Sequence, residues 1–163
     1  MTHSSIIHRS AFAATAAVLL TSNMATPQPP RTTSARPRAK LEAVAETKLL
    51  MEGLLLPNFK GLERNLRQRP ADDTAWTFAR GQALIVAETG NLLLLRPPKS
   101  SGQDVWIELA ADLREKAARL ARSVAAKDLE QCRTGLADLA VTCNRCHQTF
   151  GQSMRLVPFA DAP

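Results

Sequence analysis

Apolar residues recur every three or four positions in four stretches of the chain, which is the spacing of amphipathic helices. The first stripe consists of Leu41, Val44, Met51, Leu55, Phe59, Leu62 and Leu66, with Lys48 as its one cation. The second consists of Trp76, Ala79, Ala83 and either Val86 or Ala87. The third contains Trp106, Leu109, Leu113, Ala117, Leu120 and Val124. The fourth contains Leu129, Cys132, Leu136, Leu139, Cys143, Cys146 and Phe150. Each stripe predicts a helix with one buried face.

Prolines and capping residues mark where these helices should begin, bend or end. Pro57 lies within the first stretch, so we expect that helix to kink or restart there, and Arg69-Pro70 closes it. Asp72 or Asp73 is expected to cap the second helix, and Asp128 the fourth. Short acidic side chains suit these positions because they accept hydrogen bonds from the free N–H groups at a helix start.

The other boundaries complete an all-helical pattern. Gly90-Asn91 predicts the end of the second helix or a distortion in it, and Arg96-Pro97-Pro98 predicts a firm stop. The third helix should begin near Gln103 or Asp104. No run of alternating apolar and polar residues predicts a strand. The pattern therefore predicts an all-α fold, an antiparallel four-helix bundle that occupies residues 41–163.

The N-terminal residues have a different composition. Residues 11–20 form a short uncharged apolar run after a weakly basic start, which is typical of a signal peptide. We predict that residues 1–25 are removed on export to the periplasm or an equivalent space, and that no membrane span is left afterwards. Residues 26–40 are rich in Pro and Arg, which predicts a disordered linker. The alternative to the signal peptide is an ordinary apolar helix, and the alternative to the linker is an extended arm that binds an acidic partner.

The charge and the aromatic content argue against a nucleic-acid partner. The net charge is +6, but residues 1–40 hold five Lys and Arg residues and no acidic residue. The predicted bundle is therefore nearly neutral, so no basic face is indicated. Aromatic residues make up 4% of the chain and Tyr is absent, which leaves few platforms for stacking bases.

The run Cys143-Asn144-Arg145-Cys146-His147 indicates the chemistry of the chain. Two residues three or four positions apart lie on one face of a helix, so both thiols and the imidazole of His147 share a face. Each thiol can form a thioether with one vinyl group of a haem, and His147 can ligate the iron from the proximal side. This pattern is typical of covalent c-type haem attachment, which takes place outside the cytoplasm and agrees with export.

Two other interpretations of the cysteine pair are weaker. A zinc site needs about four ligands, and Cys132, about 16 Å away along the helix, cannot complete one. A thioredoxin-like redox pair is expected at the start of a helix in a βαβ unit, not late in the last helix of an all-α chain. Cys132 itself is expected to be a small buried core residue.

Three segments of the last two predicted helices carry a family resemblance. They are Val105-Trp106 through Leu120, Ala125-Ala126-Lys127-Asp128-Leu129, and Cys143-Asn144-Arg145-Cys146-His147-Gln148-Thr149-Phe150. These segments resemble the class II c-type cytochromes, which include the cytochrome c prime proteins and their low-spin relatives. The resemblance implies a four-helix bundle with one haem c bound near the C-terminus.

The resemblance also implies that the distal side of the haem is formed by the first helix. Met51 lies on the inward stripe there and is the candidate distal iron ligand, although Met also fills gaps in a core. Met154 follows His147 by seven residues. It is therefore expected on the proximal face, about 10 Å along the axis, from where it cannot reach the distal side.

Other residues are expected near the haem. Trp106 and Phe150 should pack against it. Thr47 stands where many members of the family carry Arg, and Lys48 is expected to replace that Arg at a haem propionate. Gly151 stands where many members carry a basic residue, which weakens the interpretation as a gas-binding protein.

The sequence thus predicts an exported monohaem c-type cytochrome that transfers electrons to redox partner proteins and is not an enzyme. Its iron is expected to be held by His147 and Met51. The alternative is a five-coordinate protein of the cytochrome c prime type that binds nitric oxide or carbon monoxide. An accessory haem subunit of a larger redox complex is a third interpretation. Homodimerisation through the first and second helices is expected from the resemblance.

Overall fold

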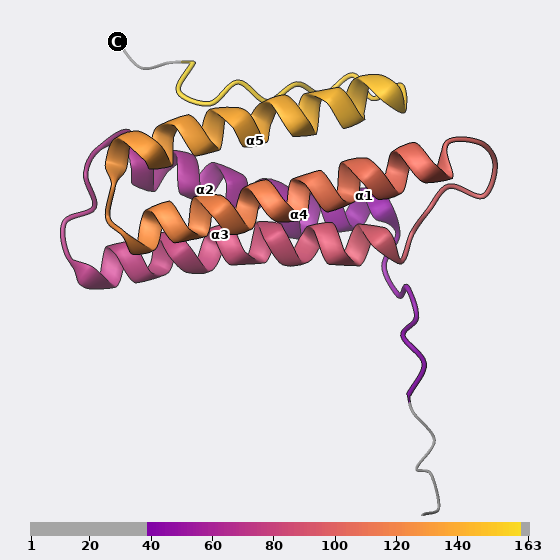
Figure 1. Ribbon diagram of the computed structural model, residues 1–163, viewed down its shortest axis with the longest axis horizontal. Coiled ribbons are helices and arrows are strands. Elements are labelled where there is room, and N and C mark those ends of the chain that lie inside the picture. Colours follow the sequence, from indigo (N-terminus) through magenta and orange to yellow (C-terminus); the bar gives the residue numbers. More distant parts are fainter. Residues whose placement is uncertain (1–38, 161–163) are drawn as a thin grey trace, which may run out of the picture. The chain divides into compact units, whose positions relative to one another are not determined.

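A computed structural model describes residues 39–160, which are all-helical with loops between the helices (Figure 1). The elements are α1 (Thr47–Leu50), a turn of π-helix η1 (Met51–Leu55), α2 (Leu56–Arg67), α3 (Asp73–Leu94), α4 (Gln103–Ala125) and α5 (Leu129–Thr149). α1, η1 and α2 follow one another without a break, so four helical stretches form a bundle. The most extensive packing is between α3 and α4. The predicted signal peptide, residues 1–25, and nearly all of the predicted linker lie outside the described residues.

The helix boundaries follow largely from capping residues. Asp72 caps α3 by accepting a hydrogen bond from the N–H of Ala75 at 2.8 Å, and Asp128 caps α5 by accepting one from Gln131 at 3.1 Å. Both caps are as predicted, as are the start of α4 at Gln103 and the stop before Pro97. None of the helices in the described part is both long and apolar enough to cross a bilayer.

The core consists of the inward faces that the stripes predicted. Its fully buried large side chains include Phe59, Leu62, Leu66, Leu120, Leu136 and Leu139. Cys132 is completely buried among them, as expected. Trp76 is also buried, and the guanidinium carbon of Arg69 lies 5.6 Å from the centroid of its ring. Side chains of this size, fully removed from water, provide most of the driving force that holds the bundle together.

The first helix begins later than its stripe predicted. Leu41 and Val44 were expected to face inward, but they are 79% and 95% exposed, and the helix starts at Thr47. Nε of Arg96, just beyond the end of α3, donates to the carbonyl oxygen of Ala45 at 3.0 Å. Residues before Ala45 therefore extend past the end of the neighbouring helix, where no apolar surface is available to bury them.

Pro57 is accommodated by the π-helical turn that precedes it. Pro57 occupies the first turn of α2, and it has no N–H to donate to the preceding helical turn. The N–H of Leu56 donates to the carbonyl oxygen of Met51, five residues earlier, which widens the helix at this point. The restart expected at Pro57 is thus realised as a change of helix type, with the chain continuing in the same stretch.

Gly90 lies within α3 and does not end it, so of the two alternatives predicted at Gly90-Asn91, a helix end or a distortion, the helix end is wrong. α3 runs on to Leu94. A Cβ atom at position 90 would lie 2.9 Å from the carbonyl oxygen of Ala110 and 2.8 Å from the Cβ of Arg114, both in α4. The missing side chain therefore lets the two helices approach closely, and this is why the pattern contains a glycine here.

The segment after α5, residues 150–160, turns back along that helix, and we call it the C-terminal strap (Figure 1). Gly151 has φ +70°, and the N–H groups of Gly151 and Gln152 donate to the carbonyl oxygens of Gln148 and His147. This pair of bonds is the Schellman arrangement that closes a helix with a left-handed glycine. It reverses the chain direction immediately after the Cys-x-x-Cys-His run.

Candidate functional site

A cavity of about 490 Å³ opens between α1, η1, α4, α5 and the C-terminal strap. Its volume lies in the range of about 300–1,000 Å³ that is usual for small-molecule and cofactor sites. Most of its lining is apolar: Met51, Leu55, Leu93, Trp106, Leu109, Ala110, Leu113, Phe150 and Met154. Besides Cys143, Cys146 and His147, the polar lining residues are Thr47, Lys48, Glu52, Thr142 and Gln152. The cavity therefore suits a large, mainly apolar molecule.

Cys143, Cys146 and His147 all line this cavity, from the last two turns of α5. The helix brings them to one face, as their spacing predicted. Cys143 is buried, whereas Cys146 and His147 are half-buried. All three Cys residues are free thiols. The wall thus presents two thiols and one imidazole to the same apolar space.

The two thiols are held in the protonated form. Burial, and then the neighbouring Cys146, raise the pKa of Cys143 to about 12, against smaller lowerings by a backbone hydrogen bond and by Lys116. Burial also raises the pKa of Cys146, although the charge of Arg145 opposes the shift. Cysteines that act in thiol–disulfide exchange have lowered pKa values, because the thiolate is the reacting form. This wall therefore does not have the electrostatics of a dithiol redox site.

His147 is oriented by the C-terminal strap. Its Nδ1 lies 3.0 Å from the carbonyl oxygen of Met154. A carbonyl oxygen can only accept, so Nδ1 is the donor in this contact. Nε2 is then the ring nitrogen that is available as a ligand atom.

The position expected for Met154 is wrong. It was placed on a continuation of the fourth helix, away from the distal side, but α5 ends at Thr149 and Met154 lies on the strap. Its side chain is 46% exposed and lines the cavity together with Met51. Two methionine side chains therefore line the cavity, Met51 from η1 and Met154 from the C-terminal strap.

The residues predicted on the first helix also reach the cavity. Met51 begins the π-helical turn and is half-buried, with its side chain against the core. Lys48 lies one turn earlier at the cavity, where its Nζ is 3.8 Å from a carboxylate oxygen of Glu52. This ion pair is largely exposed and contributes little to stability, so the ammonium group can move to another anion at little cost.

Trp106 and Phe150 form an aromatic wall of the cavity. Their ring centroids are 5.1 Å apart and their planes are inclined by 74°, an edge-to-face contact. Nε1 of Trp106 donates to the carbonyl oxygen of Leu93 at 2.8 Å, which fixes the indole against the end of α3. Both residues were predicted near the site, and the structure brings them together there.

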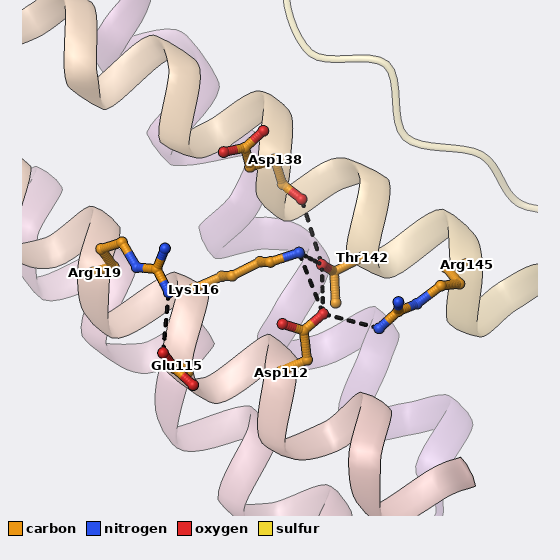
Figure 2. A network of polar contacts seen from close by, with 7 residues as sticks. All are labelled: Asp112, Glu115, Lys116, Arg119, Asp138, Thr142 and Arg145. Atoms are coloured by element: carbon orange, nitrogen blue, oxygen red, sulfur yellow. Dashed lines mark hydrogen bonds and ion pairs between the residues drawn. The ribbon is translucent and has the colours of Figure 1, made fainter.

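A polar network that the sequence analysis missed lies beside Cys143 (Figure 2). Oδ2 of Asp112 in α4 accepts hydrogen bonds from Thr142 at 3.1 Å and from Arg145 at 3.0 Å, both in α5. Nζ of Lys116 donates to the Thr142 hydroxyl at 2.7 Å and lies 3.3 Å from the same carboxylate oxygen. Thr142 is 2% exposed and also lines the cavity. Periodicity within one helix does not predict which side chains of α4 meet which side chains of α5, so the sequence alone contains no indication of this network.

The described residues do not provide a zinc site. Within residues 39–160, no three side chains of His, Cys, Asp or Glu converge as metal ligands. Cys132 is in the core and does not line the cavity. The alternative interpretation of the cysteine pair as half of a tetrahedral zinc site therefore lacks its remaining ligands in this part of the chain.

Neither a scan against protein-family models nor a search of curated proteins finds a match to this chain. The family resemblance carried by its last two helices therefore stays a prediction, and the function must be argued from the cavity.

Proposed function

We propose that the protein is an exported monohaem c-type cytochrome that transfers electrons to redox partner proteins. The observation that carries this proposal is the placement of Cys143, Cys146 and His147 on one face of α5, at the wall of a cavity of about 490 Å³. In this proposal the four helical stretches run antiparallel around the haem, and the protein is not an enzyme.

The lining of the cavity supports haem as the ligand. A covalently attached c-type haem needs two thiols that react with its vinyl groups, an axial imidazole and a largely apolar pocket, and these are the groups that α5 and its neighbours present. Bound haem would supply a one-electron iron couple. The protein's own residues would attach it through Cys143 and Cys146, ligate the iron through Nε2 of His147, and exclude water with Leu109, Leu113 and Phe150. Lys48 is available at the cavity edge for a propionate.

We further propose Met51 as the distal ligand. It is half-buried and lines the cavity from η1, whereas His147 lines it from α5. A thioether suits haem iron and raises its potential, which favours electron transfer. Without a ligating thioether, the apolar lining would leave an open position for carbon monoxide or nitric oxide, and the protein would be of the cytochrome c prime type.

The first experiment tests covalent attachment. The full chain is produced with the periplasmic haem-attachment machinery, and haem that survives denaturing electrophoresis is measured together with the pyridine haemochrome spectrum. We expect the wild type to keep its haem and the double variant Cys143→Ala/Cys146→Ala to lose it. Cys132→Ala is the matched control, because Cys132 is the one described cysteine that does not line the cavity. A wild type without covalent haem would refute the proposal.

The second experiment tests the distal ligand with a matched pair of methionines. We expect the wild type to be low-spin in the ferric state, with the weak long-wavelength band of sulfur-to-iron ligation. Met51→Leu should be high-spin and should bind carbon monoxide, whereas Met154→Leu should keep the wild-type spectrum. The opposite result for the two variants would assign the ligand to Met154. A high-spin wild type that binds carbon monoxide would favour the gas-binding alternative.

Homodimerisation through the first and second helical stretches also belongs to this proposal. Phe78, Leu84 and Ile85 of α3 are 62%, 42% and 38% exposed, which leaves apolar surface on the second stretch. We expect the protein to migrate as a dimer in light-scattering chromatography and Phe78→Lys to shift it towards the monomer.

A further inference from the structure

Beyond the ligands themselves, the structure contains a chain of contacts that holds the imidazole of His147 from behind. The acceptor for Nδ1 of His147 is a backbone carbonyl oxygen, that of Met154, on the C-terminal strap. A backbone carbonyl group moves only with its own chain, so the position of this oxygen depends on what holds the strap. The strap has no regular secondary structure between Gln152 and Val157, and its backbone must therefore be fixed by other groups.

Asn144 provides the nearest of these groups. It lies between the two cysteines of the motif, but its side chain faces the strap. Its Nδ2 donates to the carbonyl oxygen of Leu156 at 2.8 Å, and its Oδ1 accepts from the N–H of Leu156 at 2.8 Å. This two-way contact uses both ends of the amide, and it fixes the strap two residues after Met154. The side chain of Leu156 is buried beneath it.

Glu63 provides the second attachment, on α2. The N–H of Phe159 donates to Oε1 of Glu63 at 2.8 Å. Glu63 is only 4% exposed, and its carboxylate is held by Lys60 at 2.9 Å and Arg67 at 3.1 Å. A buried carboxylate with two cations and a backbone donor is a rigid acceptor. The far end of the strap is thus joined to a helix that does not contribute to the thiol wall.

A competing donor makes this fixation consequential. Nη1 of Arg155 also donates to the carbonyl oxygen of Met154, at 3.0 Å, and to that of Gln152 at 2.8 Å. The same oxygen therefore serves two donors, and a small displacement of the strap would leave it to the exposed Arg155 alone. The group that holds the strap thereby decides whether Nδ1 of His147 keeps its acceptor.

We propose that Asn144 and Glu63 are positioning residues for His147, which act through the C-terminal strap. The proposal rests on the proposed function, since it assigns the two residues to the axial ligand of the haem. A hydrogen bond from Nδ1 to a carbonyl oxygen fixes the tautomer and the ring orientation and makes Nε2 a stronger donor to the metal. A stronger donor stabilises the ferric state more than the ferrous state, so the strap lowers the reduction potential.

The main experiment measures the midpoint potential of the haem-loaded full chain. Asn144→Ala should raise it, because a displaced strap removes the acceptor of Nδ1. A tenfold loss of preference for ferric iron would raise the potential by about 59 mV for this one-electron couple. Asn144→Asp keeps the acceptor for the Leu156 N–H and loses only the donor, so its shift should be smaller. Glu63→Ala should act in the same direction, and Glu63→Gln, which keeps an acceptor oxygen, should restore most of the wild-type value.

Arg133→Ala is the matched structural control. Arg133 also joins α5 to α2, through the carbonyl oxygens of Leu66 and Arg67, but it lies far along α5 from His147. This variant should be less stable than the wild type and should have the same potential. If Arg133→Ala shifts the potential as much as Asn144→Ala, or if Asn144→Ala does not shift it, the proposal is wrong.

A second measurement separates this proposal from the proposed function. His147 is the one His after residue 8, so its ring nitrogens are readily assigned by nitrogen NMR of the full chain. In the haem-free chain we expect the Nδ1–H tautomer in the wild type and a mixture of tautomers in Asn144→Ala. In the haem-loaded chain Nε2 is occupied by iron, so the proton stays on Nδ1 in both, and we expect its hydrogen-bonded chemical shift to be lost in Asn144→Ala. If the wild type binds no haem but this difference between it and Asn144→Ala is seen, the proposed cytochrome function is refuted and the positioning role of Asn144 is supported. A protein that binds haem, but whose haem-free tautomer and haem-loaded Nδ1–H shift are both unchanged in Asn144→Ala, would support the cytochrome and refute the positioning role.

Discussion

Two glycines of α3 allow a sharp test of the packing that forms one wall of the cavity. Gly90 faces α4, where an added Cβ would lie 2.9 Å from the carbonyl oxygen of Ala110 and 2.9 Å from the backbone N of Arg114. Gly81 is in the same helix, and an added Cβ there would meet no atom within 4 Å. Gly→Ala is therefore the same chemical change in the same helix at both sites, with contact at one site and open space at the other.

The expected magnitudes follow from these distances. Alanine in place of glycine within a helix stabilises it by about 0.5–1 kcal/mol, because the unfolded chain loses more freedom. Gly81→Ala should show this gain. Gly90→Ala should gain the same amount but should lose about 1–3 kcal/mol to overpacking, because backbone atoms of α4 cannot turn aside as a side chain could. The free energy of unfolding should therefore be lower for Gly90→Ala than for Gly81→Ala by about 1–3 kcal/mol.

The assay is urea unfolding of the two variants and the wild type under identical conditions, with thermal unfolding as a check. A difference of 1 kcal/mol corresponds to roughly 4 °C in Tm for a domain of this size. Ala110 lines the cavity, so displacement of α4 should also change the absorption spectrum of any haem bound in Gly90→Ala, and not in Gly81→Ala. Equal stabilisation by both substitutions would show that α3 and α4 do not approach closely at Gly90.

Three further predictions concern the helix cap, the buried thiol and the buried carboxylate. Asp72→Ala should cost about 1 kcal/mol in the free energy of unfolding, because the N–H of Ala75 loses its acceptor. Asp73→Ala, which removes only an exposed ion pair with Lys127, should change it by less than about 0.5 kcal/mol, and equal losses would contradict the assignment of the cap. Burial, and then Asp128, raise the pKa of Cys132 to about 11. A thiol reagent at pH 8 should therefore modify Cys132 only as fast as the protein unfolds. Fast labelling would show that Cys132 lies outside the core. For Glu63, burial alone would raise the pKa, but the hydrogen bond from Lys60, the N–H of Phe159 and the charge of Arg67 together lower it below 4.5. Glu63 therefore stabilises the fold fully above pH 4.5 and loses this contribution as the pH falls through its folded pKa. Amide protons of the strap should accordingly lose hydrogen-exchange protection in acid. In Glu63→Gln the protection of these amides should not depend on pH in this range.

Local signals predicted much of the fold. Asp128 and the pair Asp72 or Asp73 were predicted as caps because a capping side chain acts on backbone groups two or three residues away. The buried faces of α4 and α5 followed from their periodicity for the same reason, since a helix repeats within a few residues. The thiol wall is also local, because the spacing of Cys143, Cys146 and His147 fixes their common face wherever the helix packs.

The errors arose where a local pattern depended on a partner. Leu41 and Val44 continue the apolar stripe, but α3 ends beside Ala45 and leaves nothing to cover them. Glycine is typical of helix ends, but Gly90 instead allows α3 to approach α4 closely, and no spacing within the sequence predicts such a contact. Met154 was misplaced because the helix was extended past Gly151, although a glycine just after a periodic stretch is a recognised stop signal.

The two residues between the cysteines show how the site is aimed. Successive residues of a helix are separated by about 100°, so Asn144 lies on one flank of the face that carries Cys143, Cys146 and His147, and Arg145 lies on the side nearly opposite that face. Asn144 binds the strap, and Arg145 binds Asp112 of α4. α5 is thus tied to a different neighbour at each of these two positions. A substitution at either position should therefore weaken one attachment of α5 while the motif that defines the site is intact.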